Sequence, residues 1–247
     1  MEESNQLHKE SRTEFLDLNT KQKELSIFPS PWKYYIKLRL PSLVSLLKSS
    51  SQDLRLPCIS LMYNGWNGHV LAKNYKAPQF VYGEFSSLSQ YIEILNSCNR
   101  LKPDCKFVDL GSGLGKVNLL VALHYNIKES LGIELVHRLN RVSDAHGWIY
   151  NNFLKQFFNR QSKVEFKHAD ILKSFKDWKD ADVVFMNSIT WKAKMMKKLT
   201  YLLEQLKEGS EVIATTALPT KTLKLYKTIE VNADWGNCKA YFYTKSC

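Results

Sequence analysis

Residues 107–120, FVDLGSGLGKVNLL, constrain the fold more strongly than any other part of the sequence. An apolar run typical of a buried strand contains Asp109, three glycines follow within five residues, and a second apolar run of helical length begins at Lys116. A glycine loop between a strand and a helix lets a ligand approach the backbone at the amino end of the helix. The segment therefore predicts a ligand-binding turn at the edge of an α/β sheet.

From residue 80 onward, strand and helix patterns alternate. The expected strands are residues 106–110, 131–135, 164–168, 182–186, 211–216, 226–231 and 239–244. The expected helices are residues 86–99, 116–125, 136–158 and 192–209. Such alternation indicates a parallel sheet covered on both faces, and the turn at 232–237 predicts an antiparallel hairpin. The predicted fold class is α/β: a doubly wound, seven-strand Rossmann-like sheet with a terminal antiparallel hairpin and a small, mainly helical N-terminal extension.

Residues 1–77 differ in composition from the rest of the chain, and we expect them to form an extension to a main domain of residues 78–247. Residues 1–25 are polar with both charge signs, whereas residues 27–76 are rich in aromatic side chains and punctuated by proline. This pattern predicts short helices that pack on the main domain and contribute to a lid.

The cellular setting is indicated by the start of the chain and by its cysteines. No signal-peptide pattern is present, and the longest early apolar run, residues 40–47, is far too short to cross a bilayer. Five scattered cysteines without a CxxC pair argue against a disulfide framework and a structural zinc site, and no metal site is expected. The sequence favours an intracellular protein, in the nucleus or the cytoplasm, without membrane contact.

The chain is strongly basic. Thirty-five Lys and Arg residues against 24 Asp and Glu residues give a net charge of +11. Such a surface attracts anionic partners, nucleic acid and chromatin among them. The densest group of lysines, within residues 191–198, lies on an expected helix. It predicts either a solvated helix face or a contact for an acidic substrate.

The spacing of Gly111, Gly113 and Gly115 restricts the ligand. A dinucleotide fingerprint would need its third glycine at position 116, and a phosphate-binding Walker loop would also need a glycine there. Lys116 occupies that position, and no GK[ST] follows. Neither a pyrophosphate nor a triphosphate is therefore the expected ligand.

Acidic residues lie at the ends of the first two expected strands and directly after the third. Asp109, directly before the loop, would repel a phosphate and attract an ammonium group. Glu134, at the end of the second strand, can accept hydrogen bonds from ribose hydroxyls, and Asp170, after the third strand, can meet an adenine edge. An ammonium group combined with an unphosphorylated ribose is found in S-adenosylmethionine, which is the expected cofactor.

The same region carries a wider set of motifs. They are VYGE at 81–84, FVDLGSGLGK at 107–116, GIEL at 132–135, VVFMNSITW at 183–191 and YFY at 241–243. With these motifs the sequence resembles the seven-strand class I methyltransferases, and among them the disruptor-of-telomeric-silencing (Dot-one-like) lysine methyltransferases that lack a SET domain. The resemblance covers residues 78–245. It implies a protein-lysine N-methyltransferase whose substrate is a protein lysine, with a histone or nucleosome as a candidate.

The resemblance also implies two groups of site residues. The cofactor-binding group is Tyr82, Gly83, Glu84, Asp109, Gly111, Gly113, Gly115, Lys116, Glu134, Asp170 and Ile171. The catalytic group is Asn187, near the transferable methyl, with Tyr241 and Trp191 as walls of a channel for the target lysine. The chain departs from the family at Lys116, where a glutamine is usual, and at Ile189, where a phenylalanine is usual.

Methyl transfer to a lysine requires a neutral amine. Its reference pKa of about 10.4 makes deprotonation at pH 7.4 cost about 4 kcal/mol, and burial beside a positive charge lowers that pKa. A strong general base is therefore not needed, which agrees with a candidate set of Asn187, Trp191 and Tyr241.

Two alternatives remain open from the sequence. One is a nucleic-acid or small-molecule methyltransferase of the same fold, although the segment NSIT at 187–190 lacks the Pro-Pro-aromatic sequence usual for transfer to nucleic-acid amines. The other is a catalytically degenerate basic scaffold. The presence of Glu84, Asp109, Glu134 and Asn187 argues against degeneration.

Overall fold

The fold is described from a computed structural model of the chain. The described residues are 30–49, 53–73, 75, 83–85, 87–233 and 236–246.

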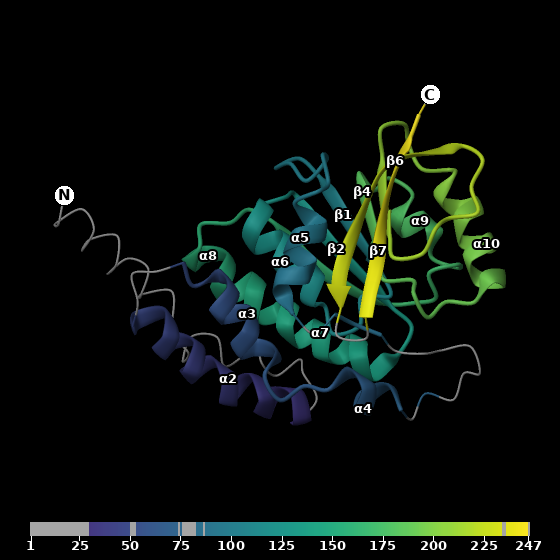
Figure 1. The fold of residues 1–247 in the computed structure, drawn as a ribbon. Helices are drawn as coiled ribbons and strands as arrows, with labels where there is room; N and C mark the ends of the chain where they lie inside the picture. The colour runs from purple at the N-terminus through teal and green to yellow at the C-terminus, as the bar shows by residue number, and fades with distance from the viewer. Residues whose placement is uncertain are drawn as a thin grey trace, which may run out of the picture.

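A single seven-stranded sheet forms the centre of the molecule (Figure 1). The strands are β1 (Lys106–Leu110), β2 (Glu129–Glu134), β3 (Lys163–His168), β4 (Val183–Met186), β5 (Glu211–Ala214), β6 (Leu223–Ala233) and β7 (Gly236–Lys245). Their order is β3-β2-β1-β4-β5-β7-β6; neighbours among β1–β5 are parallel, whereas β7 is antiparallel to both β5 and β6. The predicted doubly wound sheet with a terminal hairpin is confirmed.

Helices cover both faces of the sheet. They are α5 (Leu88–Leu95), α6 (Lys116–Tyr125), α7 (His137–Ile149), the π-helical turn η2 (Tyr150–Leu154), α8 (Lys155–Phe157), α9 (Phe175–Trp178) and α10 (Ala193–Leu203). Successive strand residues enter different cores: Phe107 packs with α5, α6 and α7, whereas Val108 packs with α9 and α10. β1, β2, β4 and β5 are buried on both sides, which explains the nearly continuous apolar runs that predicted them.

Three further helices precede the sheet: α2 (Ser30–Ser49), α3 (Arg55–Tyr63) and α4 (Gly68–Ala72). They pack on α6 and α7, away from the strands (Figure 1). The prediction of short helices is wrong for α2, which spans 20 residues with Pro41 inside. Pro41 is exposed, while Ile36, Leu40 and Leu43 form a buried apolar stripe on the other side. Burial of that stripe outweighs the helix-breaking tendency of proline.

The α2–α4 helices share one apolar core with the sheet face beneath α6 and α7. The predicted division at residues 1–77 and 78–247 stays a prediction. Among the helices that the structure describes, none is both long and apolar enough to cross a membrane.

Candidate active site

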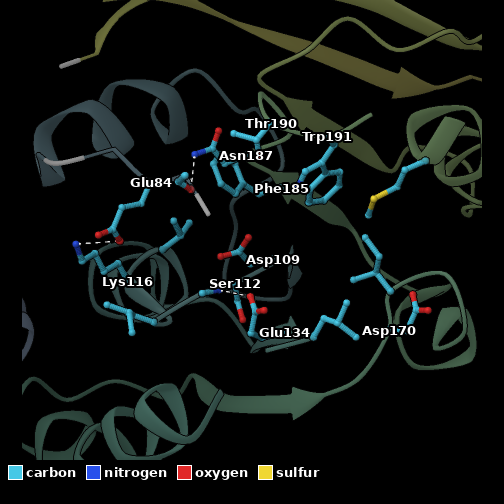
Figure 2. A pocket seen from close by; sticks show the side chains of 18 of the residues that line it. Glu84, Asp109, Ser112, Lys116, Glu134, Asp170, Phe185, Asn187, Thr190 and Trp191 are labelled. Carbon is cyan, nitrogen blue, oxygen red and sulfur yellow. Dashed lines mark hydrogen bonds and ion pairs between the residues drawn. The ribbon is translucent and has the colours of Figure 1, made fainter. Parts of the chain in front are cut away.

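A cavity of about 440 Å³ opens at the carboxyl ends of β1, β2 and β4 (Figure 2). Here the strand order reverses, because β1 has β2 on one side and β4 on the other. Open α/β sheets bind ligands at such a switch point. The predicted site residues that line the cavity are Gly83, Glu84, Asp109, Gly111, Gly113, Lys116, Glu134, Asp170, Ile171, Asn187 and Trp191.

Two predicted site residues, Gly115 and Tyr241, lie outside the cavity lining, and a third is not among the described residues. Tyr82 lies outside the described residues. Gly115 is the N-cap of α6 and does not line the cavity. Tyr241 lies on β7 opposite Ala214 of β5, where it packs against the core on the α9 and α10 face rather than lining the cavity.

The glycine loop leaves β1 in a left-handed backbone conformation. The φ angles are +79° at Gly111, +55° at Gly113 and +82° at Gly115, values that side-chain-bearing residues rarely adopt. A Cβ on Gly111 would lie 3.0 Å from the indole ring of Trp191. Gly111 is therefore required both for the turn and for the close approach of Trp191.

Glu134 braces this loop. Its carboxylate accepts hydrogen bonds from the amides of Gly113 (2.8 Å) and Val136 (2.7 Å). One side chain thus joins the end of β2 to both the glycine loop and the start of α7. Each carboxylate oxygen has a further lone pair available for a ligand hydroxyl.

Asp109 is the second buried carboxylate of the cavity, with only 3% of the residue exposed. No hydrogen bond or ion pair reaches its side chain from another described residue. Burial raises the pKa of Asp109 well above its ordinary value, and the nearby charge of Glu134 raises it further. Burial also raises the pKa of Glu134, although hydrogen bonds from backbone amides oppose that rise. The two acids form an anionic floor that a cationic ligand would neutralise.

The wall above the floor contains an ion pair. The Lys116 ammonium lies 3.1 Å from a carboxylate oxygen of Glu84. Figure 2 marks this ion pair with a dashed line. The same ammonium lies 5.6 Å from the centre of the Tyr63 ring, a residue of α3. The cavity therefore presents a positive and a negative group side by side next to the glycine loop.

Asn187 follows β4 and connects two parts of the site. Its amide nitrogen donates to the carbonyl of Gly83 (3.2 Å), and its side-chain oxygen accepts from the Thr215 hydroxyl (2.9 Å). The side chain is thereby held from both ends. It joins the end of β4 to the segment that carries Glu84.

The structure adds lining residues that the sequence reasoning missed. They are Tyr91, Ser112, Leu114, Val117, Leu135, Leu172, Phe185, Thr190, Lys194, Met195 and Lys198. Tyr91 belongs to α5, and its hydroxyl accepts from the Phe85 amide (3.1 Å), which only the tertiary fold reveals. Lys194 and Lys198 are one turn apart on α10, so the lysine-rich segment 191–198 was a usable signal.

In the described parts of the chain, no three His, Cys, Asp or Glu side chains lie close enough together to bind a metal ion. The four described cysteines are free thiols.

The fold agrees with that of solved methyltransferase structures. An RNA methyltransferase from Salinibacter ruber, crystallised with S-adenosyl-L-homocysteine, superposes with a TM-score of 0.51 at 20% identity, over 65% of this chain and 93% of that one. At this identity the likeness concerns the fold, which is that of the class I methyltransferases.

The family follows from the sequence. A family model described as "Histone methylation protein DOT1" matches residues 67–237, and the chain belongs to this family. The resemblance predicted from the motifs is confirmed.

Two relatives are named "Histone-lysine N-methyltransferase, H3 lysine-79 specific". The one from Caenorhabditis elegans is 32% identical over 170 residues, covering 66% of this chain. The one from Candida glabrata is 29% identical over 150 residues, covering 58% of this chain. The chain spans 18% and 22%, respectively, of the lengths of these relatives.

Proposed function

We propose that this chain is an S-adenosylmethionine-dependent protein-lysine N-methyltransferase. The observation that carries the proposal is the pair of buried carboxylates, Asp109 and Glu134, beneath the glycine loop of a DOT1-family chain. Asp109 has no cationic partner among the described residues. An ammonium-bearing ligand would neutralise this floor, whereas a phosphate-bearing ligand would be repelled by it.

The residues of the cavity fit the separate parts of this cofactor. Asp109 and Glu84 would hold its ammonium group, and Lys116 its carboxylate, because the ion pair already presents both charges. Glu134 would accept from ribose hydroxyls with its remaining lone pairs. Asp170, with the apolar Ile171 beside it, would meet the adenine.

When bound, S-adenosylmethionine supplies a methyl group on a positively charged sulfur, and this group passes to nitrogen as the carbon–sulfur bond breaks. The task of the protein is alignment and exclusion of water. Phe185, Tyr91 and Trp191 give the cavity aromatic walls that favour a neutral amine over an ammonium. Asn187, held at both ends of its side chain, would orient the incoming amine.

A histone lysine within a nucleosome is the proposed substrate, since relatives carry names specific for lysine 79 of histone H3. The net charge of +11 would favour a nucleoprotein, with contact to its nucleic acid through the basic surface. A nuclear location follows from that substrate.

The test incubates the chain with methyl-labelled cofactor and, in separate arms, nucleosomes, free histones, total protein extract and RNA. We expect label in lysine of a histone, identified by mass spectrometry. Label in RNA without label in protein would overturn the lysine proposal. Absence of cofactor binding by calorimetry would favour the scaffold alternative.

A matched pair of variants tests the carboxylate floor. Asp109→Asn keeps the shape and removes the charge, and we expect at least about a 100-fold loss of affinity for S-adenosylhomocysteine, as for a buried charge pair that is broken. Asp104→Asn makes the same change at an exposed position and should leave affinity unchanged. Equal binding by the Asp109 variant would mean that the cofactor loop is misassigned.

A further inference from the structure

The glycine loop is held not only from the sheet but also from the N-terminal helices. The carbonyl oxygen of Leu114, which lies between the last two glycines of the loop, accepts a hydrogen bond from the Tyr63 hydroxyl at 3.0 Å. Nδ1 of His146, a residue of α7, lies 3.3 Å from the same oxygen. Tyr63 is the last residue of α3.

His146 is fully buried where these elements meet. Its ring packs edge-on against Tyr63, with centroids 4.3 Å apart, and against Tyr35 of α2, at 5.5 Å. Its Nε2 lies 2.7 Å from the Tyr35 hydroxyl oxygen. Burial lowers the pKa of His146 to about 3, so the ring is neutral near physiological pH. A carbonyl only accepts hydrogen bonds, so the tautomer with its proton on Nδ1 is the one that donates a hydrogen bond to Leu114. In that tautomer Nε2 accepts from the Tyr35 hydroxyl, which otherwise donates to the carbonyl of Met62.

The Leu114 segment needs such support. Gly113 and Gly115 flank it, and a residue between two glycines has neighbours with wide backbone freedom. From the side of the sheet, Glu134 holds the amide of Gly113. From α3, the Tyr63 hydroxyl donates a hydrogen bond to the carbonyl of Leu114. The loop is therefore held between β2 and the N-terminal helices.

Tyr63 also contacts the ion pair between Lys116 and Glu84 in the wall of the cavity. Its ring faces the ammonium of Lys116 at 5.6 Å, and that ammonium pairs with Glu84. Figure 2 shows this pair at one end of the cavity, with Glu134 below the loop. One tyrosine of α3 thus contacts both the loop backbone and the cation of the cavity wall.

We propose that the helices α2 and α3 complete the cofactor site, with Tyr63 and His146 as positioning residues that fix the Leu114 peptide. The inference rests on the proposed function for the identity of the ligand. It assigns to the N-terminal helices a role in cofactor affinity.

The first test is Tyr63→Phe, which removes the hydroxyl and keeps the ring. Loss of one partner of a buried carbonyl predicts a roughly tenfold weaker binding of S-adenosylhomocysteine by calorimetry. The KM for S-adenosylmethionine should rise by a similar factor, while the KM for the lysine substrate stays unchanged. Hydrogen exchange of the loop peptide should become faster.

Tyr226→Phe is the matched control. It also removes a partly buried hydroxyl, one that donates to Glu211 at 2.9 Å, at the amino end of β5 and away from the cavity. This variant should lower the melting temperature without changing cofactor affinity. A merely structural role for Tyr63 predicts that the two variants behave alike, and that result would overturn the inference.

Variants of His146 provide the second test. They test the same inference if the Tyr63→Phe variant does not fold. His146→Asn keeps an N–H donor near the position of Nδ1, whereas His146→Leu removes it. We expect the asparagine variant to bind the cofactor more tightly than the leucine variant, and equal affinity in both would contradict the inference. If the unaltered chain binds no cofactor, the proposed function fails; if it binds and Tyr63→Phe binds equally well, only the inference fails.

Discussion

The ionised carboxylate of Asp109 destabilises the ligand-free protein, because it is buried without a cationic partner among the described residues. The same property would make it a binding site for a cationic ligand. Its carboxylate is buried next to Glu134 and receives no hydrogen bond from the described residues. Glu134 differs, because hydrogen bonds from two backbone amides offset part of the effect of its burial. The uncompensated negative charge therefore lies on the carboxylate of Asp109, and a bound cation would compensate it.

Asp109→Asn should therefore stabilise the ligand-free protein while it weakens cofactor binding. A carboxyl whose pKa is higher in the folded than in the unfolded chain loses stability as pH rises from its ordinary pKa through its raised pKa. The variant lacks this loss. We expect its melting temperature to exceed that of the unaltered chain by a few degrees near pH 8, with the difference shrinking as the pH falls toward the ordinary aspartate pKa. A melting temperature equal or lower at every pH would contradict this view of Asp109.

Asn187→Ala should separate turnover from binding. The side chain is fixed by Gly83 and Thr215, and its loss misplaces the reacting groups rather than the cofactor floor. We expect kcat to fall about 10- to 100-fold, with the affinity for S-adenosylhomocysteine nearly unchanged. Thr215→Val, which removes only the support of Asn187, should cause a smaller fall. A loss of affinity for S-adenosylhomocysteine with unchanged kcat would contradict this role and indicate that Asn187 acts in cofactor binding.

Three elements near the glycine loop, α6, β2 and α7, pack closely against β3 through glycines. Gly115 at the start of α6, Gly132 of β2 and Gly147 of α7 all face the ring of Phe166 on β3, and a Cβ on these glycines would lie 2.4, 2.5 and 3.0 Å from it. The ring of Phe166 therefore fills the space that these three glycines leave on α6, β2 and α7. This explains Gly115, which the motif predicted as a cofactor residue and which lies behind the cavity.

Gly115→Ala and Gly209→Ala should differ in stability despite similar backbones. Both glycines have φ in the left-handed region, at +82° and +75°, but nothing lies within 4 Å of a Cβ built on Gly209. We expect Gly209→Ala to cost about 1 kcal/mol of unfolding free energy, from backbone strain alone. Gly115→Ala adds the clash with Phe166 and should cost about 3 kcal/mol or more in chemical denaturation. Equal costs would mean that the ring moves aside freely.

In the described part of the chain, the N-terminal helices and one face of the sheet share an apolar core. Leu43 of α2 and Phe107 of β1 belong to the same apolar core, with α6 and α7 between them. The N-terminal helices therefore contribute to the stability of the sheet and, through Tyr63, contact the glycine loop.

Thermal unfolding should accordingly show one cooperative transition. Leu43→Ala removes a side chain that is 2% exposed, and we expect a loss of about 2–5 kcal/mol and a lower melting temperature for the entire transition. Lys48→Ala, at an exposed position of the same helix, should have little effect. Two calorimetric transitions, with only one shifted by Leu43→Ala, would support the separate extension of residues 1–77 instead.

Local patterns were sufficient for the sheet and for the floor of the cavity. Buried parallel strands are continuous apolar runs, and the acids Asp109 and Glu134 end such runs, so their meeting at one edge follows from the alternation of strands and helices. The left-handed turn also requires glycines wherever it occurs.

Contacts between distant segments could not be predicted in this way. Tyr63 and Leu114 are 51 residues apart, and His146 is 32 residues from Leu114, so no local periodicity links them. The local effect of Pro41 disfavours a long helix at α2. Burial of one apolar stripe of α2 against the other helices nevertheless stabilises this helix. Chain-local preferences are encoded over a few residues, whereas hydrogen-bond partners and buried faces depend on how the complete chain packs.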